Sequence, residues 1–240
     1  MKMKCSRCGR KAAVELKYFD GILCNRCFSS LFEKRVKKYI RVNKLLEKKD
    51  TVVLGLSGNR DSTVLLHIFK KIFFKAPKSK LIAVTMDNGS STRTVDFTRK
   101  LCEKLDVEYH TCKKGKTSIW TALGSRAKAL KADKIALGIN LDDEVEYTLE
   151  RIFKGELRGV YSKEKIGVIK PLRESPKKEV ELYAKANRIK YIKEGRKEED
   201  EFKDSVKKML ADLERKQPGS KFKLLKSGDK FMEALKNMKS

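Results

Sequence analysis

The six residues from Ser57 to Ser62 bring hydroxyls, a glycine, an arginine and an aspartate together at one break in an apolar run. Residues 52–56 are apolar and rich in valine, as in a buried strand, and apolar residues recur at helical intervals over 65–73. The break is therefore a strand-to-helix turn, where free backbone N–H groups and the helix dipole attract anions. Gly58 permits close approach of a ligand, and Arg60 adds positive charge. We predict phosphate binding here, and a capped helix start without a ligand is the alternative.

Carboxylates and amides follow this turn and two later strands. Asp61 would repel a phosphate unless it caps the helix or helps to hold a metal ion. Apolar strands are predicted at 81–86 and 134–139. The polar residues that follow them are Asp87, Asn140, Asp142 and Asp143. Because ligands bind at the carboxyl ends of parallel strands, these side chains indicate a site for a magnesium nucleotide, with simple N-capping as the alternative for the last two.

Four cysteines near the start of the chain have the spacing of metal ligands. They form two Cys-x-x-Cys pairs separated by fifteen residues, namely Cys5, Cys8, Cys24 and Cys27. Two such turns can close a tetrahedral thiolate site around one zinc ion. Disulfides are the alternative, and they are unusual in a Lys-rich intracellular protein. We predict a structural zinc ribbon over residues 1–30.

The other two cysteines differ from this set and from each other. Cys102 falls on the apolar side of a predicted helix and is expected to be a buried core thiol. Cys112 ends a predicted strand and precedes a run of lysines, whose charge would favour a nucleophilic thiolate, although an incidental thiol is the alternative. His67 and His110 are the only histidines, so a histidine-based catalytic or metal site is poorly supported.

The charge of the chain indicates a polyanionic partner. Lys and Arg total 58 against 32 Asp and Glu, a net charge of +26. Basic runs recur at 34–44, 113–116 and 215–239, which suits contacts to nucleic-acid phosphates better than one sequence-reading helix. A heat-adapted composition would raise Glu together with Lys, and here the acids lag far behind. No basic amphipathic helix with a wide apolar face indicates membrane binding.

The predicted elements alternate strand and helix from residue 51 onward, which indicates right-handed crossovers and an α/β fold with a mainly parallel sheet. The 240 residues, 40% of them hydrophobic, suffice for one medium domain and a small appendage. The sequence has neither a run of eighteen apolar residues nor a secretory signal, so we expect a soluble cytoplasmic protein without membrane contact.

Several motifs, taken in order, resemble those of a known family. They are the two Cys-x-x-Cys pairs, Ser57–Ser62, Met86–Gly89, GINLDDE at 138–144, KPLRE at 170–174 and QPGSKFKLL at 217–225. This order resembles the tRNA 2-thiouridine synthetases of the PP-loop, or N-type ATP pyrophosphatase, superfamily. The resemblance implies an adenine nucleotide alpha hydrolase-like PP-loop fold, with helices on both faces of the sheet. It divides the chain into a zinc ribbon (1–30), a basic linker helix (31–50), a PP-loop domain (51–195) and a helical, basic C-terminal region (196–240).

The resemblance also implies a reaction. ATP is cleaved between its α and β phosphates, AMP is placed on the C2 oxygen of a tRNA uridine, and a sulfur donor then displaces it. Asp61, and Cys112 as a sulfur carrier, are the expected catalytic residues, with Mg²⁺ held near Asp61 and Asp143. The expected nucleotide-binding residues are Leu56, Ser57, Gly58, Asn59, Arg60, Asp61, Ser62, Met86, Asp87, Gly138, Asn140 and Asp143. The expected partners are tRNA, a sulfur-carrier protein or an active paralogue, and a second copy of the chain.

Some residues depart from the family pattern. Asn59 replaces the second glycine of the loop, and Ile139 replaces a histidine. Cys112 matches the first cysteine of an expected pair, but Gly115 stands at the second, and the later Cys-Pro and C-terminal zinc module are not seen. An iron–sulfur cluster held by Cys112 alone is therefore unlikely, because a cluster takes several thiolates. A noncatalytic tRNA-binding paralogue, a partner subunit of an active enzyme and a PP-loop ligase of another substrate remain alternatives.

Overall fold

The computed structural model describes residues 3–16, 21–87, 92–113, 118–156, 166–193 and 200–237. Its centre is a five-stranded sheet in the order β5-β4-β3-β6-β7, with every neighbouring pair parallel. The strands are β3 (Thr51–Gly55), β4 (Lys80–Asp87), β5 (Glu108–Lys113), β6 (Lys134–Leu137) and β7 (Gly167–Ile169). The predicted α/β fold with a parallel sheet is therefore confirmed.

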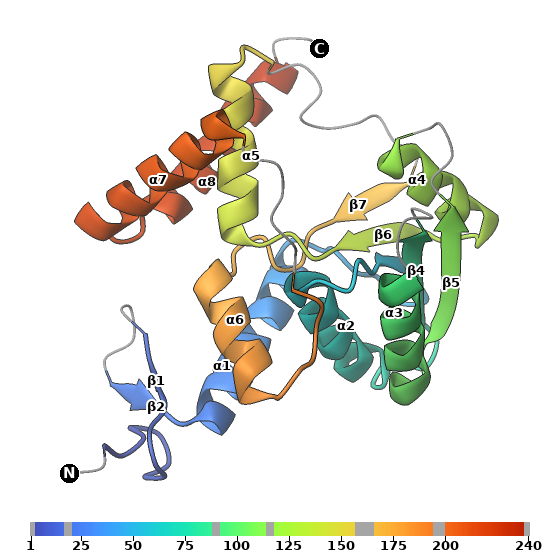
Figure 1. Ribbon diagram of the computed structural model, residues 1–240, viewed down its shortest axis with the longest axis horizontal. Coiled ribbons are helices and arrows are strands. Elements are labelled where there is room, and N and C mark those ends of the chain that lie inside the picture. Colours follow the sequence, from blue (N-terminus) through green and yellow to red (C-terminus); the bar gives the residue numbers. More distant parts are fainter. Residues whose placement is uncertain are drawn as a thin grey trace.

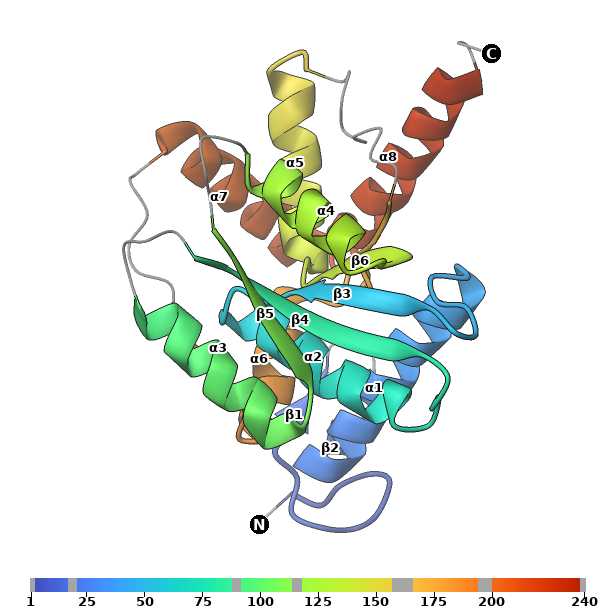
Figure 2. The same cartoon turned by 90° about the vertical axis from the view of Figure 1, so that its right-hand side faces the viewer.

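Helices cover both faces of this sheet (Figures 1 and 2). Figure 2 shows α1, α2, α3 and α6 on one side and α4, α5, α7 and α8 on the other. The bounds in the sheet domain are α2 (Arg60–Phe73), α3 (Thr92–Leu105), α4 (Ile119–Ala129), α5 (Leu141–Phe153) and α6 (Lys177–Ala186). Since side chains alternate along a strand, Val52 and Leu54 join the core under α2, while Val53 packs against α4 with Leu123.

The N-terminal segment is joined firmly to the sheet domain. A short antiparallel pair, β1 (Val14–Glu15) and β2 (Ile22–Leu23), leads into α1 (Asn25–Val42). Along α1, apolar residues recur every four positions and are buried, among them Phe28 and Phe32. The Phe32 ring stacks on Tyr183 of α6 with 4.9 Å between ring centroids. The basic residues of α1 therefore lie on a helix that is part of the core.

The C-terminal segment is a pair of helices, α7 (Glu201–Lys216) and α8 (Ser220–Asn237). Val206 and Leu210 of α7 and Leu225 of α8 form a small apolar cluster with Leu141 and Val145 of α5. The pair thus packs on α5, which begins at the carboxyl edge of the sheet (Figure 1).

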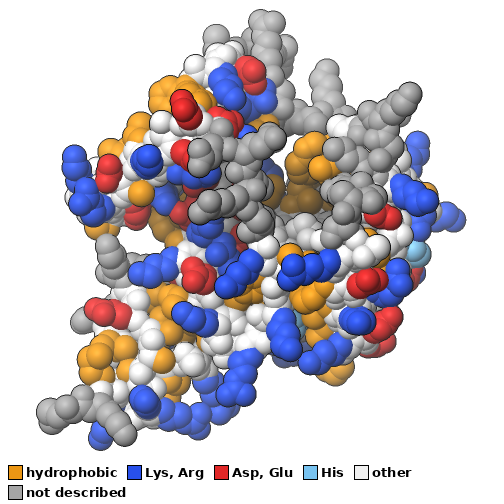
Figure 3. Space-filling view, in the orientation of Figure 1, with side chains coloured by type: hydrophobic (Ala, Val, Ile, Leu, Met, Phe, Trp, Pro, Cys, Tyr) orange, Lys and Arg blue, Asp and Glu red, His pale blue; other side chains and the backbone are white. Residues whose placement is uncertain are grey.

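The surface charge and the hydropathy of the helices both bear on function. Lys and Arg side chains are spread over the face shown in Figure 3, with fewer acidic groups between them. Among the described residues, no helix is long and apolar enough to cross a bilayer.

Candidate active site

The turn after β3 is shaped by Gly58, which has a left-handed backbone with φ of 77°. A Cβ atom at this position would lie 3.2 Å from Cδ1 of Ile192 and 3.3 Å from Cγ2 of Thr98. The carbonyl oxygen of Gly58 accepts a hydrogen bond of 2.8 Å from the Ile192 backbone N–H. Glycine is therefore required here both by the backbone angle and by the neighbours packed against the turn.

Asn59 begins α2 as its N-cap. Its backbone is extended, with φ of −68° and ψ of 171°, so the left-handed residue of the turn is Gly58. Oδ1 of Asn59 accepts a hydrogen bond of 3.0 Å from the backbone N–H of Ser62. The hydroxyls of Ser57 and Ser62 are 3.1 Å apart. In this conformation the Asn59 side chain occupies an N–H group that a phosphate oxygen would otherwise use.

Asp61 is buried in the first turn of α2 and has two partners. Arg60 donates to it from Nε (2.9 Å to Oδ1) and from Nη2 (3.1 Å to Oδ2). Asn140 donates from Nδ2 to Oδ2 of Asp61 across 3.0 Å in a buried bond. The expected residues Arg60, Asp61 and Asn140 thus meet at one point, where β3 and β6 end.

Asn140 also caps α5 in a capping box with Asp143. Its Oδ1 accepts from the Asp143 backbone N–H at 3.0 Å, and Oδ2 of Asp143 accepts from the Asn140 backbone N–H at 3.5 Å. Burial, reinforced by the charge of Asp61, raises the pKa of Asp143 to about 6. The carboxylate oxygens of Asp61 and Asp143 are the kind of ligand that a divalent cation such as Mg²⁺ prefers, and Arg60 is the positive charge already paired with Asp61.

Gly138 allows this contact between β6 and α2. A Cβ atom here would lie 2.5 Å from the backbone nitrogen of Ser62 and 2.7 Å from the carbonyl carbon of Asp61. No side chain fits, because the obstacle is the backbone of α2 itself. The small residue at 138 therefore sets how closely the two strand ends approach.

Asp142 and Glu144, the other acids of the GINLDDE segment, face away from Asp61. Asp142 accepts from the Lys177 backbone N–H at 2.7 Å and pairs with Lys221 of α8. Glu144 is buried and binds Lys170 Nζ at 2.7 Å and Arg173 Nε at 3.0 Å. These two acids attach the C-terminal helices and the segment after β7 to α5, which is a structural role.

The remaining expected residues lie along the same edge of the sheet. Leu56 is buried and donates from its backbone N–H to Val84 at 2.8 Å. Met86 and Asp87 end β4, and Met86 stands opposite Cys112 in the parallel register of β5. Cys112 is half-buried, and its thiol lies 3.4 Å from the carbonyl oxygen of Ala122 in α4. Asn88, Gly89 and Gly115 lie outside the described residues.

Two buried threonines support the turn and were not expected from the sequence. The Thr85 hydroxyl donates to the Leu56 carbonyl oxygen at 2.8 Å and lies 3.0 Å from the Thr98 hydroxyl, which donates to the Thr94 carbonyl oxygen. This chain of bonds joins β4, α3 and the strand that leads into Ser57. A threonine in an apolar strand is a weak signal, because threonine also favours strands for packing reasons.

The four N-terminal cysteines converge as predicted. Their sulfur atoms all lie within 4.8 Å of one another, and those of Cys8 and Cys24 are 3.6 Å apart. The Cys24 thiol caps α1, and the backbone N–H of Cys27 lowers the pKa of Cys24, which favours the metal-binding thiolate. One tetrahedral ion with Zn–S bonds of about 2.3 Å fits between these atoms.

Comparisons with known proteins agree on the family of proteins that this chain resembles. A family described as the PP-loop domain matches residues 29–208. The tRNA 2-thiolation protein NcsA of Haloferax volcanii is 29% identical, over 96% of this chain and 87% of its own length. The tRNA-5-methyluridine(54) 2-sulfurtransferase of Pyrococcus horikoshii is 27% identical, over 93% and 81%. The solved U34-tRNA thiolase NcsA from Methanococcus maripaludis, with its 4Fe–4S cluster, superposes with a TM-score of 0.84 at 24% identity, over 96% and 87%.

This last structure overturns one expectation. An iron–sulfur cluster was judged unlikely, yet the thiolase from Methanococcus maripaludis carries one. The expectation considered only Cys112 and left out the N-terminal set. Among the described residues, the one group of three or more metal-binding side chains that converge is Cys5, Cys8, Cys24 and Cys27. Their sulfur atoms have the close spacing of ligands around a single ion.

Proposed function

This chain belongs to the PP-loop domain family, and we propose that it is an ATP-dependent tRNA-modifying enzyme of the tRNA sulfurtransferase type. The relatives matched over nearly all of the chain are named as tRNA 2-thiolation proteins and sulfurtransferases. They favour this function over a noncatalytic paralogue, a partner subunit or a ligase of another substrate.

The observation that carries the proposal is the meeting of two strand ends. The glycine turn after β3 and the capping box after β6 are joined by the bond between Asn140 and Asp61, and Asp143 lies beside them. A turn of this kind at a helix N-terminus binds phosphate, and the two carboxylates suit the cation that accompanies a nucleotide.

We propose the following residues as the nucleotide site: Leu56, Ser57, Gly58, Asn59, Arg60, Asp61, Ser62, Met86, Asp87, Gly138, Asn140 and Asp143. In this arrangement the backbone N–H groups at the start of α2 and the hydroxyls of Ser57 and Ser62 stabilise the pyrophosphate that leaves when ATP is cleaved between its α and β phosphates. Mg²⁺, held by Asp61 and Asp143, would neutralise phosphate charge. The AMP portion is transferred to the uridine C2 oxygen.

The sulfur step completes the reaction. A sulfur nucleophile attacks uridine C2, the C2–O bond breaks, and AMP leaves with the oxygen. Cys112 is the last but one residue of β5 and pairs with Met86, at the edge of the sheet where the nucleotide is placed, so we propose it as a candidate carrier of this sulfur. An external sulfur-carrier protein is the other source, and an active paralogue or a second copy of the chain are further candidate partners in the cytoplasm.

Pyrophosphate release from ATP tests this function directly. We expect the parent chain with Mg²⁺ and bulk tRNA to release pyrophosphate, and we expect Asp61→Ala to lose this activity. Lys75→Ala, an exposed substitution at the opposite edge of the sheet, is the matched control and should behave as the parent does. If the parent binds tRNA but releases no pyrophosphate under any of these conditions, the chain is a tRNA-binding protein without adenylating activity.

A further inference from the structure

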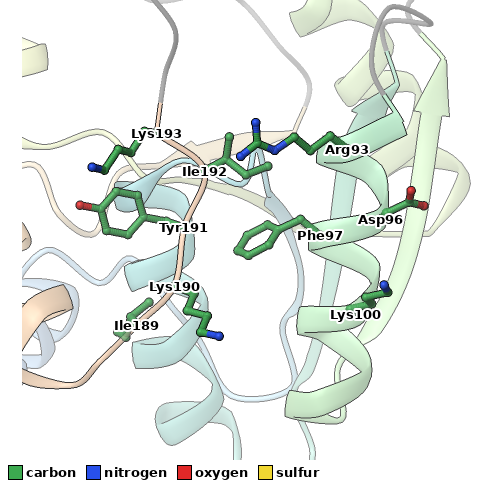
Figure 4. Close-up of a pocket in the computed structure, with 9 residues that line it drawn as sticks. All are labelled: Arg93, Asp96, Phe97, Lys100, Ile189, Lys190, Tyr191, Ile192 and Lys193. Carbon is green, nitrogen blue, oxygen red and sulfur yellow. The ribbon is translucent and has the colours of Figure 1, made fainter.

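A groove of about 700 Å³ runs between α3 and residues 189–193 (Figure 4). Arg93, Phe97 and Lys100 line it from α3. Lys190 and Ile192 line it from the opposite segment. Figure 4 shows the Phe97 ring and the Ile192 side chain between the two walls, with the Arg93 guanidinium directed toward Ile192.

One end of this groove adjoins the glycine turn of the nucleotide site. The backbone N–H of Ile192 donates to the carbonyl oxygen of Gly58 at 2.8 Å. A Cβ atom on Gly58 would lie 3.2 Å from Cδ1 of Ile192 and 3.5 Å from Cδ1 of Phe97. The side chains of Phe97 and Ile192 therefore contact the groove on one side and the turn that we assign to the pyrophosphate on the other.

The charge of the groove favours an anion. Its lining contains the cations Arg93, Lys100, Lys190 and Lys193 and a single acid, Asp96. All four cations are exposed, and Figure 4 shows the Asp96 carboxylate turned away from the space between the walls. Within the described part of the chain, no ion pair engages any of the four. Their charge is available to a partner.

Aromatic side chains are interleaved with these cations. Phe97 lies between Arg93 and Lys100 on α3, and Tyr191 lies between Lys190 and Lys193 on the facing segment. Both rings are half-buried. Cations spaced along a channel with aromatic rings between them are typical of single-stranded nucleic-acid sites, where phosphates meet the charges and bases stack on the rings.

We propose that this groove binds a single-stranded segment of the substrate RNA and leads it to the nucleotide site. The proposal rests on the proposed function, because the RNA is the molecule to be adenylated. It assigns phosphate contacts to Arg93, Lys100, Lys190 and Lys193. An acidic protein would satisfy the charges but would make no use of stacking surfaces, so we favour RNA.

Lysine footprinting tests the groove in the unaltered protein. The chain is treated with an amine-reactive reagent with and without bulk tRNA, and each lysine is followed by mass spectrometry. We expect tRNA to slow the modification of Lys190 and Lys193 several-fold. Lys75 and Lys78, exposed between α2 and β4 at the opposite edge of the sheet, should react at the same rate in both conditions. Equal protection of both pairs would overturn the proposal.

Two double variants with the same change in charge provide the second test. We expect Lys190→Glu with Lys193→Glu to weaken tRNA binding roughly tenfold at about 0.1 M salt. The salt slope of the affinity should fall by about 0.7 for each lost phosphate contact. Lys75→Glu with Lys78→Glu should change both quantities much less. ATP binding without tRNA should match the parent in both variants, which also shows that they fold.

The outcomes separate this inference from the function it rests on. If the parent shows tRNA-dependent pyrophosphate release and the groove variant keeps the parental tRNA affinity, the groove inference is wrong and the function stands. If both variants lose affinity equally, binding depends on total charge, and the groove is again not the site. If the parent neither binds tRNA nor responds to it, the proposed function and the inference fail together.

Discussion

Asn140 donates a buried hydrogen bond of 3.0 Å to Asp61, a residue 79 positions earlier in the chain. The bond joins the first turn of α2 to the N-cap of α5, so the ends of β3 and β6 are held in register at the candidate nucleotide site. Both groups also serve their own helices, because Asn140 caps α5 and Asp61 binds Arg60. Local capping and assembly of the site therefore depend on the same two side chains.

Asn140→Ala should damage both stability and nucleotide binding. It removes a helix cap and one of the two hydrogen bonds to Oδ2 of the buried Asp61, at a combined cost of about 2–3 kcal/mol in the free energy of unfolding. We expect ATP affinity to fall as well, because the two strand ends are no longer fixed. Urea unfolding and ATP titration measure the two effects. Asn43→Ala, which removes an exposed bond at the end of α1, should change neither by more than about 0.5 kcal/mol.

Asn59→Gly should strengthen ATP binding. The Asn59 side chain accepts the Ser62 N–H bond that a phosphate oxygen would use, and glycine removes this competitor. Replacing an N-cap Asn by Gly costs only a few tenths of a kcal/mol, so the fold should persist. Calorimetric titration with ATP and Mg²⁺ is the measurement, with Asn59→Ala as the comparison that also removes the side chain but keeps a Cβ. Unchanged or weaker binding by Asn59→Gly would show that Asn59 does not compete with phosphate.

The sequence predicted those parts of the molecule that depend on local patterns. The turn at Ser57–Ser62 was predicted because an apolar run stops there and a glycine follows. The metal-binding cysteines were predicted from the spacing of the two Cys-x-x-Cys pairs. The three-residue strand β7 (Gly167–Ile169) was not predicted, because so short a segment shows no periodicity. The different partners of Asp142 and Asp143 could not be predicted from the sequence either. Adjacent acids look alike in a sequence, and only packing turns one toward Asp61 and the other toward Lys221.

Removing one N-terminal thiolate should release the bound metal and destabilise the start of the chain. Cys24→Ser is the sharpest choice, because Cys24 is a proposed ligand and also caps α1. We expect metal bound to the parent to be lost in the variant, together with protection of the β1–β2 amides from hydrogen exchange. Zinc and iron are both measured, in protein prepared without oxygen. Cys102→Ser is the control, since Cys102 is buried but is not one of the four cysteines that converge, and it should keep the metal.

Asp143→Asn should stabilise the chain at neutral pH while weakening its binding of ATP with Mg²⁺. The folded pKa of about 6 lies above the ordinary value of 3.8, so the folded chain binds the proton more tightly than the unfolded chain. The free energy of unfolding therefore falls as pH rises from about 4 to 6, and above pH 6 the buried charge costs about 1–3 kcal/mol. Asparagine carries no charge, so the variant should be more stable than the parent at pH 7.5, and the difference should shrink as pH falls to 4.

Asp142→Asn is the matched control for this experiment, because it removes the neighbouring carboxylate from the same helix. Asp142 already has cationic and N–H partners in Lys221 and Lys177, so neutralising it should destabilise the chain at pH 7.5. Thermal unfolding at pH 7.5 and pH 4.5, without ATP, measures both variants. Opposite signs at pH 7.5 would establish that the Asp143 charge is kept at the expense of stability. Destabilisation by both would mean that Asp143, like Asp142, is held by favourable contacts.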